Sequence, residues 1–173
     1  MKSIKVLATM FVAAAMFAVS GCSKDDEKTV NQNDVIGSWS LDAITYSRTI
    51  SGLTGEYAQY NGTQTDSAGP EEGESSIFTF NSDGTCTLHN IFIEEEGTID
   101  ETLTGTWSVS GNTLTFDVVD ETEASSANHR VMTIKEISST KMVLAKEETV
   151  QEELVPGQMA TLTLSVEMIL KKV

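Results

Sequence analysis

Few residues in this chain of 173 have the types and spacing that chemistry requires. His89 and His129 are the only histidines, and their spacing is not that of a metal site. The sequence contains no G-x-S-x-G motif, no phosphate-binding loop and no zinc motif. We therefore expect both histidines on the surface or in loops, and we predict a protein that is not an enzyme, with no metal and no cofactor.

The densest group of potential metal ligands is acidic. Glu94, Glu95 and Glu96 precede Asp100 and Glu101, and carboxylates are suitable ligands for calcium. The segment lacks the D-x-D-x-D-G arrangement of a calcium loop, so a solvated acidic loop is the favoured interpretation. The whole chain has a formal net charge of -15, which argues against nucleic acid and anionic membrane surfaces as partners.

The N-terminal residues have the order of an export signal. Lys2 and Lys5 precede an apolar run over 6–19, which is too short for an ordinary membrane span. The letters V-S-G-C, ending at Cys22, resemble the bacterial lipobox, in which cleavage occurs before a lipidated cysteine. An ordinary secretory signal with an incidental cysteine is the alternative. We predict a signal peptide over 1–21 and lipid attachment at Cys22.

The residues behind Cys22 bear on where the protein is exported. The segment up to residue 34 is polar, charged and without periodicity, as in a flexible tether, so 22–34 is assigned as lipidated cysteine plus tether. Its start, S-K-D-D-E, resembles the surface-export signal of Bacteroidota lipoproteins; a solvated acidic linker is the alternative. We predict an outer-membrane lipoprotein exposed on the cell surface that contacts the membrane only through its anchor.

The remaining cysteine is expected to be structural. Cys86 has no partner for a disulfide within one chain, because a lipidated Cys22 cannot pair with it. Cys86 alternates with Leu88 in a strand pattern, so we interpret it as a small buried hydrophobe rather than a reactive thiol.

The folded domain, residues 35–173, has the alternation of β-strands. Leu103, Trp107 and Val109 alternate with Thr and Ser, Gly111 and Asn112 supply a turn, and apolar residues alternate again over 113–118. This hairpin pattern recurs along the domain and predicts about eight antiparallel strands and no helix. Around Asn90 the alternation of apolar and polar residues no longer shows which residues face inward, which suggests a β-bulge. The expected strands are 35–47, 77–80, 85–93, 103–109, 113–118, 131–137, 141–146 and 160–172.

The connections between these strands alternate in length. Tight turns are expected at 81–84, 110–112 and 138–140, and long loops at 48–74, 94–102, 120–129 and 147–158. Sequential hairpins favour an all-β, up-and-down antiparallel meander, and closing it into an eight-stranded barrel removes the exposed edges. A β-sandwich is the runner-up, but it needs crossover connections that the tight turns do not offer.

Several segments, in order, resemble a known family. Gly37-Ser38-Trp39 resembles the lipocalin G-x-W motif. F-T-F-N-S-D-G-T (78–85), G-T-W-S-V-S-G-N-T-L-T-F (105–116) and I-K-E-I-S-S-T-K-M-V-L (134–144) resemble the lipocalin-like lipoproteins common in Bacteroidota. The resemblance implies a barrel and, loosely, binding, with no fixed ligand or catalytic set. In lipocalins the motif tryptophan often stacks under an arginine near the last strand, where this chain offers only Lys171 and Lys172.

An up-and-down barrel would place the four long loops together at one mouth, away from the tether. There we expect a small apolar or amphiphilic ligand, and an acidic rim that repels anions. Trp39 and Trp107 are expected to plug the opposite end. The alternative is a structural or protein-interaction lipoprotein with a fully packed barrel and a surface protein as partner. The candidate ligand-binding residues are Tyr46, Tyr57, Tyr60, Phe92, Leu103 and Val118.

One short motif falls outside this scheme. Asp66-Ser67-Ala68 resembles the O-glycosylation triplet of Bacteroidota, which makes Ser67 a candidate glycosylation site. A triplet also occurs easily by chance.

Overall fold

The computed structural model describes residues 29–119 and 128–173. The predicted signal peptide, Cys22 and most of the predicted tether lie outside the described residues. No helix within the described ranges is long and apolar enough to cross a membrane. The elements in these ranges are α1 (Gln32–Val35), β1 (Gly37–Ser51), the 3-10 helix η1 (Gly55–Tyr60), β2 (Gly62–Ala68), β3 (Ser75–Phe80), β4 (Thr85–Glu94), β5 (Gly97–Ser110), β6 (Thr113–Val119), β7 (Asn128–Ile137), β8 (Lys141–Val155) and β9 (Gln158–Lys172).

Eight of these strands close into a barrel. β1 pairs with β3, each strand from β3 to β8 pairs with the next, and β9 returns to β1, always antiparallel. The predicted eight-stranded up-and-down barrel is therefore confirmed. β2 is a ninth strand outside the ring. It adds to β1 over Ile44–Ile50, beyond the short segment Gly37–Ser40 in which β1 pairs with β3.

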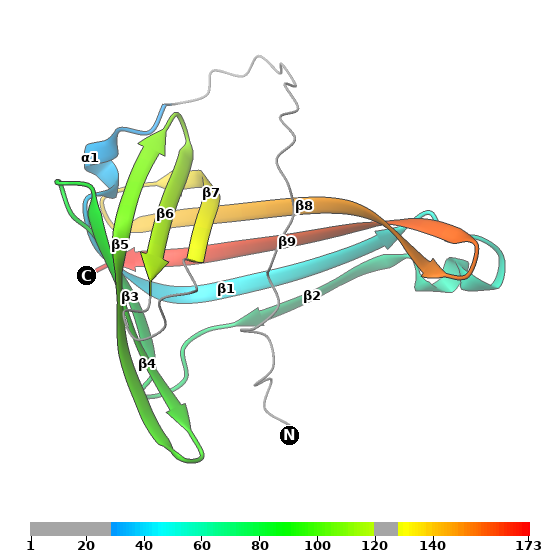
Figure 1. Cartoon of the computed structure of the whole chain (residues 1–173), viewed down its shortest axis with the longest axis horizontal. Coiled ribbons are helices and arrows are strands. Elements are labelled where there is room, and N and C mark those ends of the chain that lie inside the picture. Colours follow the sequence, from blue (N-terminus) through cyan, green and yellow to red (C-terminus); the bar gives the residue numbers. More distant parts are fainter. Residues whose placement is uncertain (1–28, 120–127) are drawn as a thin grey trace.

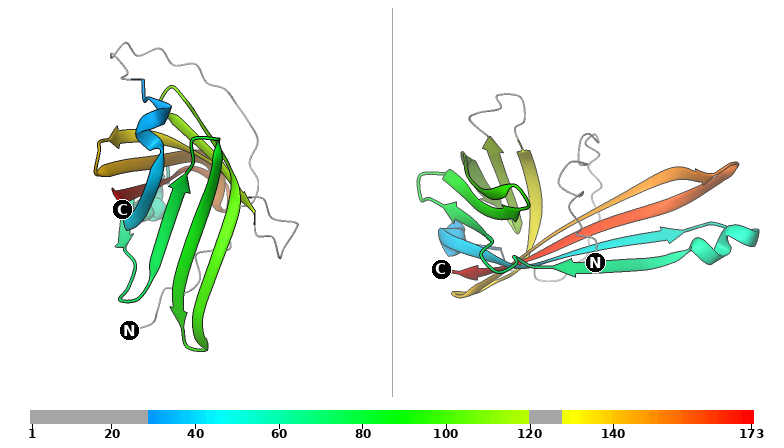
Figure 2. Two further views of the ribbon diagram at one scale, coloured as in Figure 1. Left: turned by 90° about the vertical axis from the view of Figure 1, so that its left-hand side faces the viewer. Right: turned by 90° about the horizontal axis from the view of Figure 1, so that it is seen from below.

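The barrel is compact at one end and splayed at the other. In Figure 1, β1, β2, β8 and β9 continue together far beyond the compact end, and the β4–β5 hairpin projects in a different direction. Figure 2, right, shows the four strands running side by side away from the barrel. Their order is β2-β1-β9-β8. We call the part formed by residues 44–51, 62–68, 145–155 and 158–168 the long sheet, and the compact end with the turns at 81–84, 111–112 and 138–140 the closed end.

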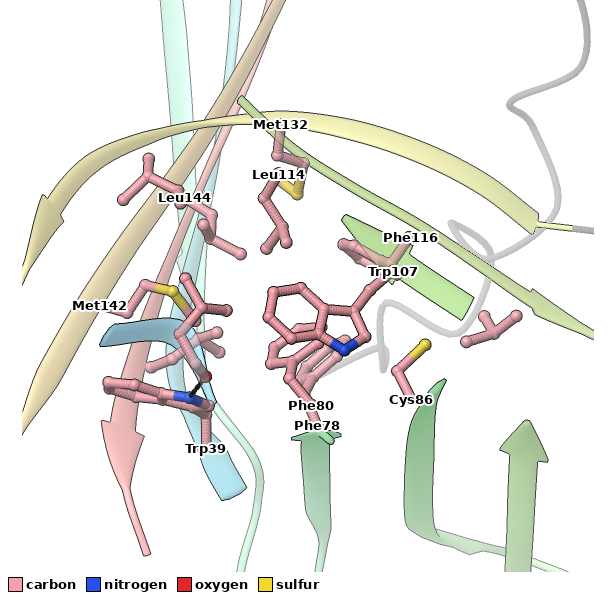
Figure 3. Packing of buried hydrophobic residues seen from close by; sticks show 14 of the residues in the cluster. Trp39, Phe78, Phe80, Cys86, Trp107, Leu114, Phe116, Met132, Met142 and Leu144 are labelled. Atoms are coloured by element: carbon pink, nitrogen blue, oxygen red, sulfur yellow. Dashed lines mark hydrogen bonds between the residues drawn. The ribbon is translucent and has the colours of Figure 1, made fainter. Parts of the chain in front are cut away.

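Aromatic and aliphatic side chains fill the closed end (Figure 3). Phe80 lies 5.2 Å from Trp107 and 6.1 Å from Phe116, measured between ring centroids. Both tryptophans are buried, and each indole N–H finds a backbone acceptor, as buried indoles require. Trp39 donates to the carbonyl of Val35 at 2.7 Å, and Trp107 donates to the carbonyl of Asn81 at 2.9 Å. The core also contains Val35, Phe78, Cys86, Leu103, Leu114, Val118, Met132, Ile134, Met142, Leu144 and Leu170.

The motif tryptophan acquires a cationic partner at this end. The Nζ atom of Lys172 lies 4.6 Å from the centre of the Trp39 ring and donates to the carbonyl of Ile36 at 2.8 Å. A cation over an indole face is attracted by the ring quadrupole. Lys172 thus occupies the position that the family resemblance assigns to an arginine.

The structure corrects the predicted loops, because 94–102 and 147–158 are largely strand and 48–74 contains two strand segments. β1 extends to Ser51 and β2 occupies 62–68; Glu95 and Glu96 form a two-residue turn before β5; β8 reaches Val155. These strands lack a clean apolar alternation because both faces of the long sheet reach solvent. Cross-strand hydroxyl pairs line one face instead, at 2.8–3.1 Å in Thr45–Ser67, Ser47–Thr65, Thr49–Thr63 and Thr149–Thr163. In the fourth predicted loop, β7 begins at Asn128, and 120–127 lie outside the described residues.

Two further expectations are wrong. The strand around Asn90 has no bulge, since its register with both neighbours is continuous. Asn90 is a buried inward-facing residue whose amide donates to the Glu101 carboxylate at 2.9 Å, and this polar residue on the inner face made the parity ambiguous. The predicted absence of helices also fails, because α1 and η1 are too short to show a helical period.

Candidate functional site

The inner face of the barrel continues without interruption onto the long sheet. Leu162, Leu164, Val166 and Met168 have the same parity along β9 as Leu170, which is fully buried in the core. Successive side chains of a strand alternate between faces, so these four residues extend the inner face outward. We call them the β9 strip. Leu162 is buried, and the other three are only half-buried.

The neighbouring strands add a mixed set of side chains to this face. Directly opposed residues of antiparallel strands point to the same side of a sheet. On β1, Ile44, Tyr46, Arg48 and Ile50 oppose the strip. On β8, the opposing residues are Lys146, Glu148 and Val150. The result is an aliphatic row bordered by one tyrosine, one arginine and a Lys146–Glu148 ion pair of 2.6 Å.

The strip is bounded at both ends. At the inner end it meets the core at Leu144 and Leu170. At the outer end Leu53 and Ala160 are buried, and the turn at Gly52 lies against Ala160. The open middle, from Leu164 to Met168, is about 13 Å long at the usual rise per strand residue.

Tyr46 on β1 and Arg130 on β7 both start on the inner face, close enough for the charge of Arg130 to act on the Tyr46 hydroxyl. Arg130 on β7 is directly opposite Phe116, a buried inner residue, so its side chain also starts inward. Burial raises the pKa of the Tyr46 hydroxyl above its ordinary value, and the positive charge of Arg130 offsets that only in part. Tyr46 is therefore protonated at neutral pH and can donate a hydrogen bond.

The structure does not bring the six predicted ligand-binding residues together. Leu103 and Val118 meet in the packed core, and Tyr57 stacks on Tyr60 in η1 with ring centroids 6.5 Å apart. Phe92 lies on the β4–β5 hairpin, which projects away from the long sheet in Figure 1. Tyr46 alone lies beside the strip. The extended strands carry the two η1 tyrosines and Phe92 toward different tips of the molecule.

Sequence reasoning missed Arg130, which falls at the edge of a predicted loop. Two signals pointed to it. Arg130 has the parity of Met132, which the pattern already placed inward, and Arg48 and Arg130 are the only arginines in a chain with 26 acidic residues. The β9 strip itself was visible as the alternation over 160–172.

The histidines and Cys86 lie in ordinary structural settings. His89 is half-buried and His129 is exposed, and each pairs with one aspartate, Asp100 and Asp117 respectively. The Cys86 thiol is buried, and burial together with the charge of Asp117 raises its pKa to about 11, so the thiol stays protonated. Within 29–119 and 128–173, no three His, Cys, Asp or Glu side chains form a group that could hold a metal ion.

A separate surface hollow lies outside the barrel at the closed end. Its volume is about 550 Å³. Two of its lysines are already neutralised, because Lys171 pairs with Asp42 at 2.7 Å and Lys141 pairs with Glu136 at 2.9 Å. We assign no ligand to this hollow. Its lining residues are Asp42, Thr140, Lys141, Ile169, Lys171 and Lys172.

Residues 35–144 match the family model described as a lipocalin-like domain. The matched residues make up more than half of the chain. The chain therefore belongs to the lipocalin-like domain family. No match was found among curated proteins.

Similar solved structures come from bacteria and from a mammal. A lipocalin-like protein from Bacteroides uniformis has 13% identity and a TM-score of 0.44 over 81% of this chain and 99% of its own. A protein from Bacteroides eggerthii has 11% identity and a TM-score of 0.42, and the match covers 81% of this chain and 100% of that protein's chain. Bovine odorant binding protein, in complex with a selenium-containing odorant, has 18% identity and a TM-score of 0.38, and the match covers 87% of this chain and 78% of the bovine chain.

Proposed function

We propose that this protein is a non-enzymatic binding protein that holds a small apolar or amphiphilic molecule on the inner face of its open end. The observation that carries the proposal is the β9 strip. An aliphatic row that continues the core yet remains half-buried is apolar surface that a ligand can remove from water. Tyr46 and Arg130 beside it supply the few polar groups that orient a ligand.

One observation favours the alternative, a structural or protein-interaction role. The closed end is filled by side chains, so a ligand cannot lie deep between Trp39 and Trp107 (Figure 3). The proposal therefore places the ligand on the strip and not in a central cavity.

Native mass spectrometry separates the two roles. We expect the wild-type protein to carry a co-purified small molecule, or to take up dodecanoate as a 1:1 adduct. Val166→Asp should lose the adduct, because a carboxylate would lie in the middle of the strip. Ser165→Asp is the matched control, since it adds the same charge to the adjacent residue on the opposite face.

Equal loss of the adduct in the two variants would contradict the proposed position of the ligand. Absence of any adduct with the wild type would favour the structural role.

We further propose that Cys22 anchors the protein in the outer membrane and that the acidic segment behind it directs the protein to the cell surface. The amide of Val30 donates to the carbonyl of Gly111 at 3.1 Å, so the chain enters the barrel at the closed end. The long sheet extends away from the end at which residue 30 joins the barrel, which is the orientation that a surface binder needs.

Cys22→Ala is expected to move the protein from the membrane fraction to the soluble fraction. Each buried CH₂ of an acyl chain contributes about 0.8 kcal/mol, so loss of the acyl chains removes the anchor. Fractionation and immunoblotting measure the result, with Cys86→Ala as the control that should stay in the membrane. If proteinase added to intact cells spares the wild type but digests it after lysis, surface exposure is refuted.

A further inference from the structure

The lysines at the closed end of this acidic protein have partners, whereas its two arginines do not among the described residues. Lys141 and Lys171 form ion pairs, and Lys172 contacts Trp39 and the carbonyl of Ile36. Within the described ranges, neither Arg48 nor Arg130 has a carboxylate within salt-bridge distance or a side-chain hydrogen bond. The chain has 26 acidic residues and two arginines, and both arginines start on the inner face without a carboxylate partner among the described residues.

The polar groups of Arg48, Arg130 and Tyr46 are hydrogen-bond donors. A guanidinium presents five N–H donors and no acceptor, and the protonated hydroxyl of Tyr46 adds an O–H. The positive charge of Arg130 reaches that hydroxyl. The hydrogen-bonding partner that satisfies such a set best is an anionic oxygen, because charge-assisted hydrogen bonds to guanidinium are stronger than neutral ones.

Apolar side chains lie immediately beside these donors. Val166 is directly opposite Tyr46, and Leu164 is directly opposite Arg48. A head group held by the donors would therefore place an attached alkyl chain along the β9 strip.

The acidic residues on the inner face of the long sheet are either paired or exposed to solvent. Glu94, Glu95 and Glu96 lie at the end of the β4–β5 hairpin, which projects away from the long sheet in Figure 1. On the inner face of the long sheet, Glu148 is neutralised by Lys146. Asp66 on the fully exposed strand β2 and the exposed Glu152 near the outer end of β8 also face this side, where water and salt screen their charges. The acidic rim expected from the sequence is therefore divided: Glu94, Glu95 and Glu96 lie away from the strip, and the glutamates of β8 lie along its edge.

We propose that the ligand is a single-chain amphiphile with an anionic head group. Arg130 and Tyr46 bind the head, Arg48 adds positive charge beside them, and the alkyl chain lies on the β9 strip. This inference rests on the proposed binding function and gives it a ligand class.

Calorimetric titration of matched C12 probes tests the inference. The protein is the mature chain, residues 22–173, with Cys22→Ala so that no acyl chain competes. The probes are dodecanoate, dodecyl phosphate, dodecanol and dodecyltrimethylammonium, each below its micelle concentration. We expect an anionic probe to bind at least about tenfold more tightly than dodecanol, and the cationic probe to bind most weakly. The tighter of the two anions identifies the head group.

Variants then identify the residues that cause the preference for the anionic probe. Arg130→Gln and Tyr46→Phe should each weaken binding of the anion by about tenfold and leave dodecanol unchanged. Arg130→Lys keeps the charge and should retain part of the preference. Lys135→Gln, which removes a positive charge from the exposed neighbouring face of β7, should change nothing. Circular dichroism and melting curves confirm that each variant is folded.

The outcomes separate this inference from the function on which it rests. Equal affinity for the anions and dodecanol, unaffected by Arg130→Gln, would overturn the anionic head group while the binding function stands. A wild type that binds none of the four probes would overturn both. An anion preference lost equally in Lys135→Gln and Arg130→Gln would show a general charge effect and would also overturn the proposed site.

Discussion

Gly105→Ala is expected to disrupt the barrel, lowering the free energy of unfolding by more than about 3 kcal/mol. A Cβ atom at Gly105 would lie 1.6 Å from the carbonyl oxygen of Asp117 and 2.9 Å from the Cα atom of Val118. Both atoms belong to the backbone of β6, which pairs with β5 at this point. The β6 backbone cannot rotate away as a flexible side chain would, so β5 and β6 must separate or shift.

Urea denaturation followed by circular dichroism measures this effect. Gly111→Ala is the matched control, because a Cβ there meets nothing within 4 Å but the backbone has φ +63°. That variant isolates the cost of a left-handed conformation, roughly 1–2 kcal/mol. If Gly105→Ala were as stable as Gly111→Ala, the close approach of β5 to β6 would be wrong.

Trp107→Ala is expected to lower the free energy of unfolding by about 3–5 kcal/mol, as other buried aromatic truncations do. The side chain is only 5% exposed, and its ring packs on Phe80. The substitution leaves a cavity at the closed end and removes the hydrogen-bond donor from the carbonyl of Asn81.

Thermal and urea unfolding measure this loss. Tyr60→Ala is the control, since Tyr60 is 59% exposed and surface substitutions usually change stability by less than about 0.5 kcal/mol. The predicted role of the two tryptophans as a plug fails if the melting temperature of Trp107→Ala matches that of Tyr60→Ala.

The strands that the sequence predicted best are those with one face in the core. Over 113–118 every second residue is buried, as in Leu114, Phe116 and Val118, so burial imposes the period of two that marks a strand. The strand 62–68 has no buried residue at all. Its conformation is determined by hydrogen bonds to β1, the preceding strand, and this pairing leaves no apolar alternation in the sequence of 62–68.

The same cause limited the prediction of the site. The inward set on β9 was visible because those residues alternate strictly with Thr, Ser and Glu. The proximity of Tyr46 to Arg130 was not visible, because it depends on the pairing of β1 with β9 at opposite ends of the domain, in addition to the hairpins β7–β8 and β8–β9. Reading the extended strands as loops also grouped Tyr57, Tyr60 and Phe92 with Tyr46, although the structure separates them.

The acidic composition has a structural consequence on the long sheet. Beyond residue 145, β8 pairs with β9 and, among the described residues, with no strand on its other side. An open strand edge is a template for aggregation, and charged side chains along the edge oppose it. The residues Glu147, Glu148, Glu152 and Glu153 supply that charge.

The most direct test of the account is an NMR titration of the methyl-labelled mature chain with dodecanoate. Ligand on the inner face should shift the methyl signals of Leu164 and Val166 on the β9 strip. The signal of Ile169, on the opposite face of β9 beside the hollow at the closed end, should stay in place. Shifts confined to Ile169, with Leu164 and Val166 unmoved, would contradict the proposed binding surface.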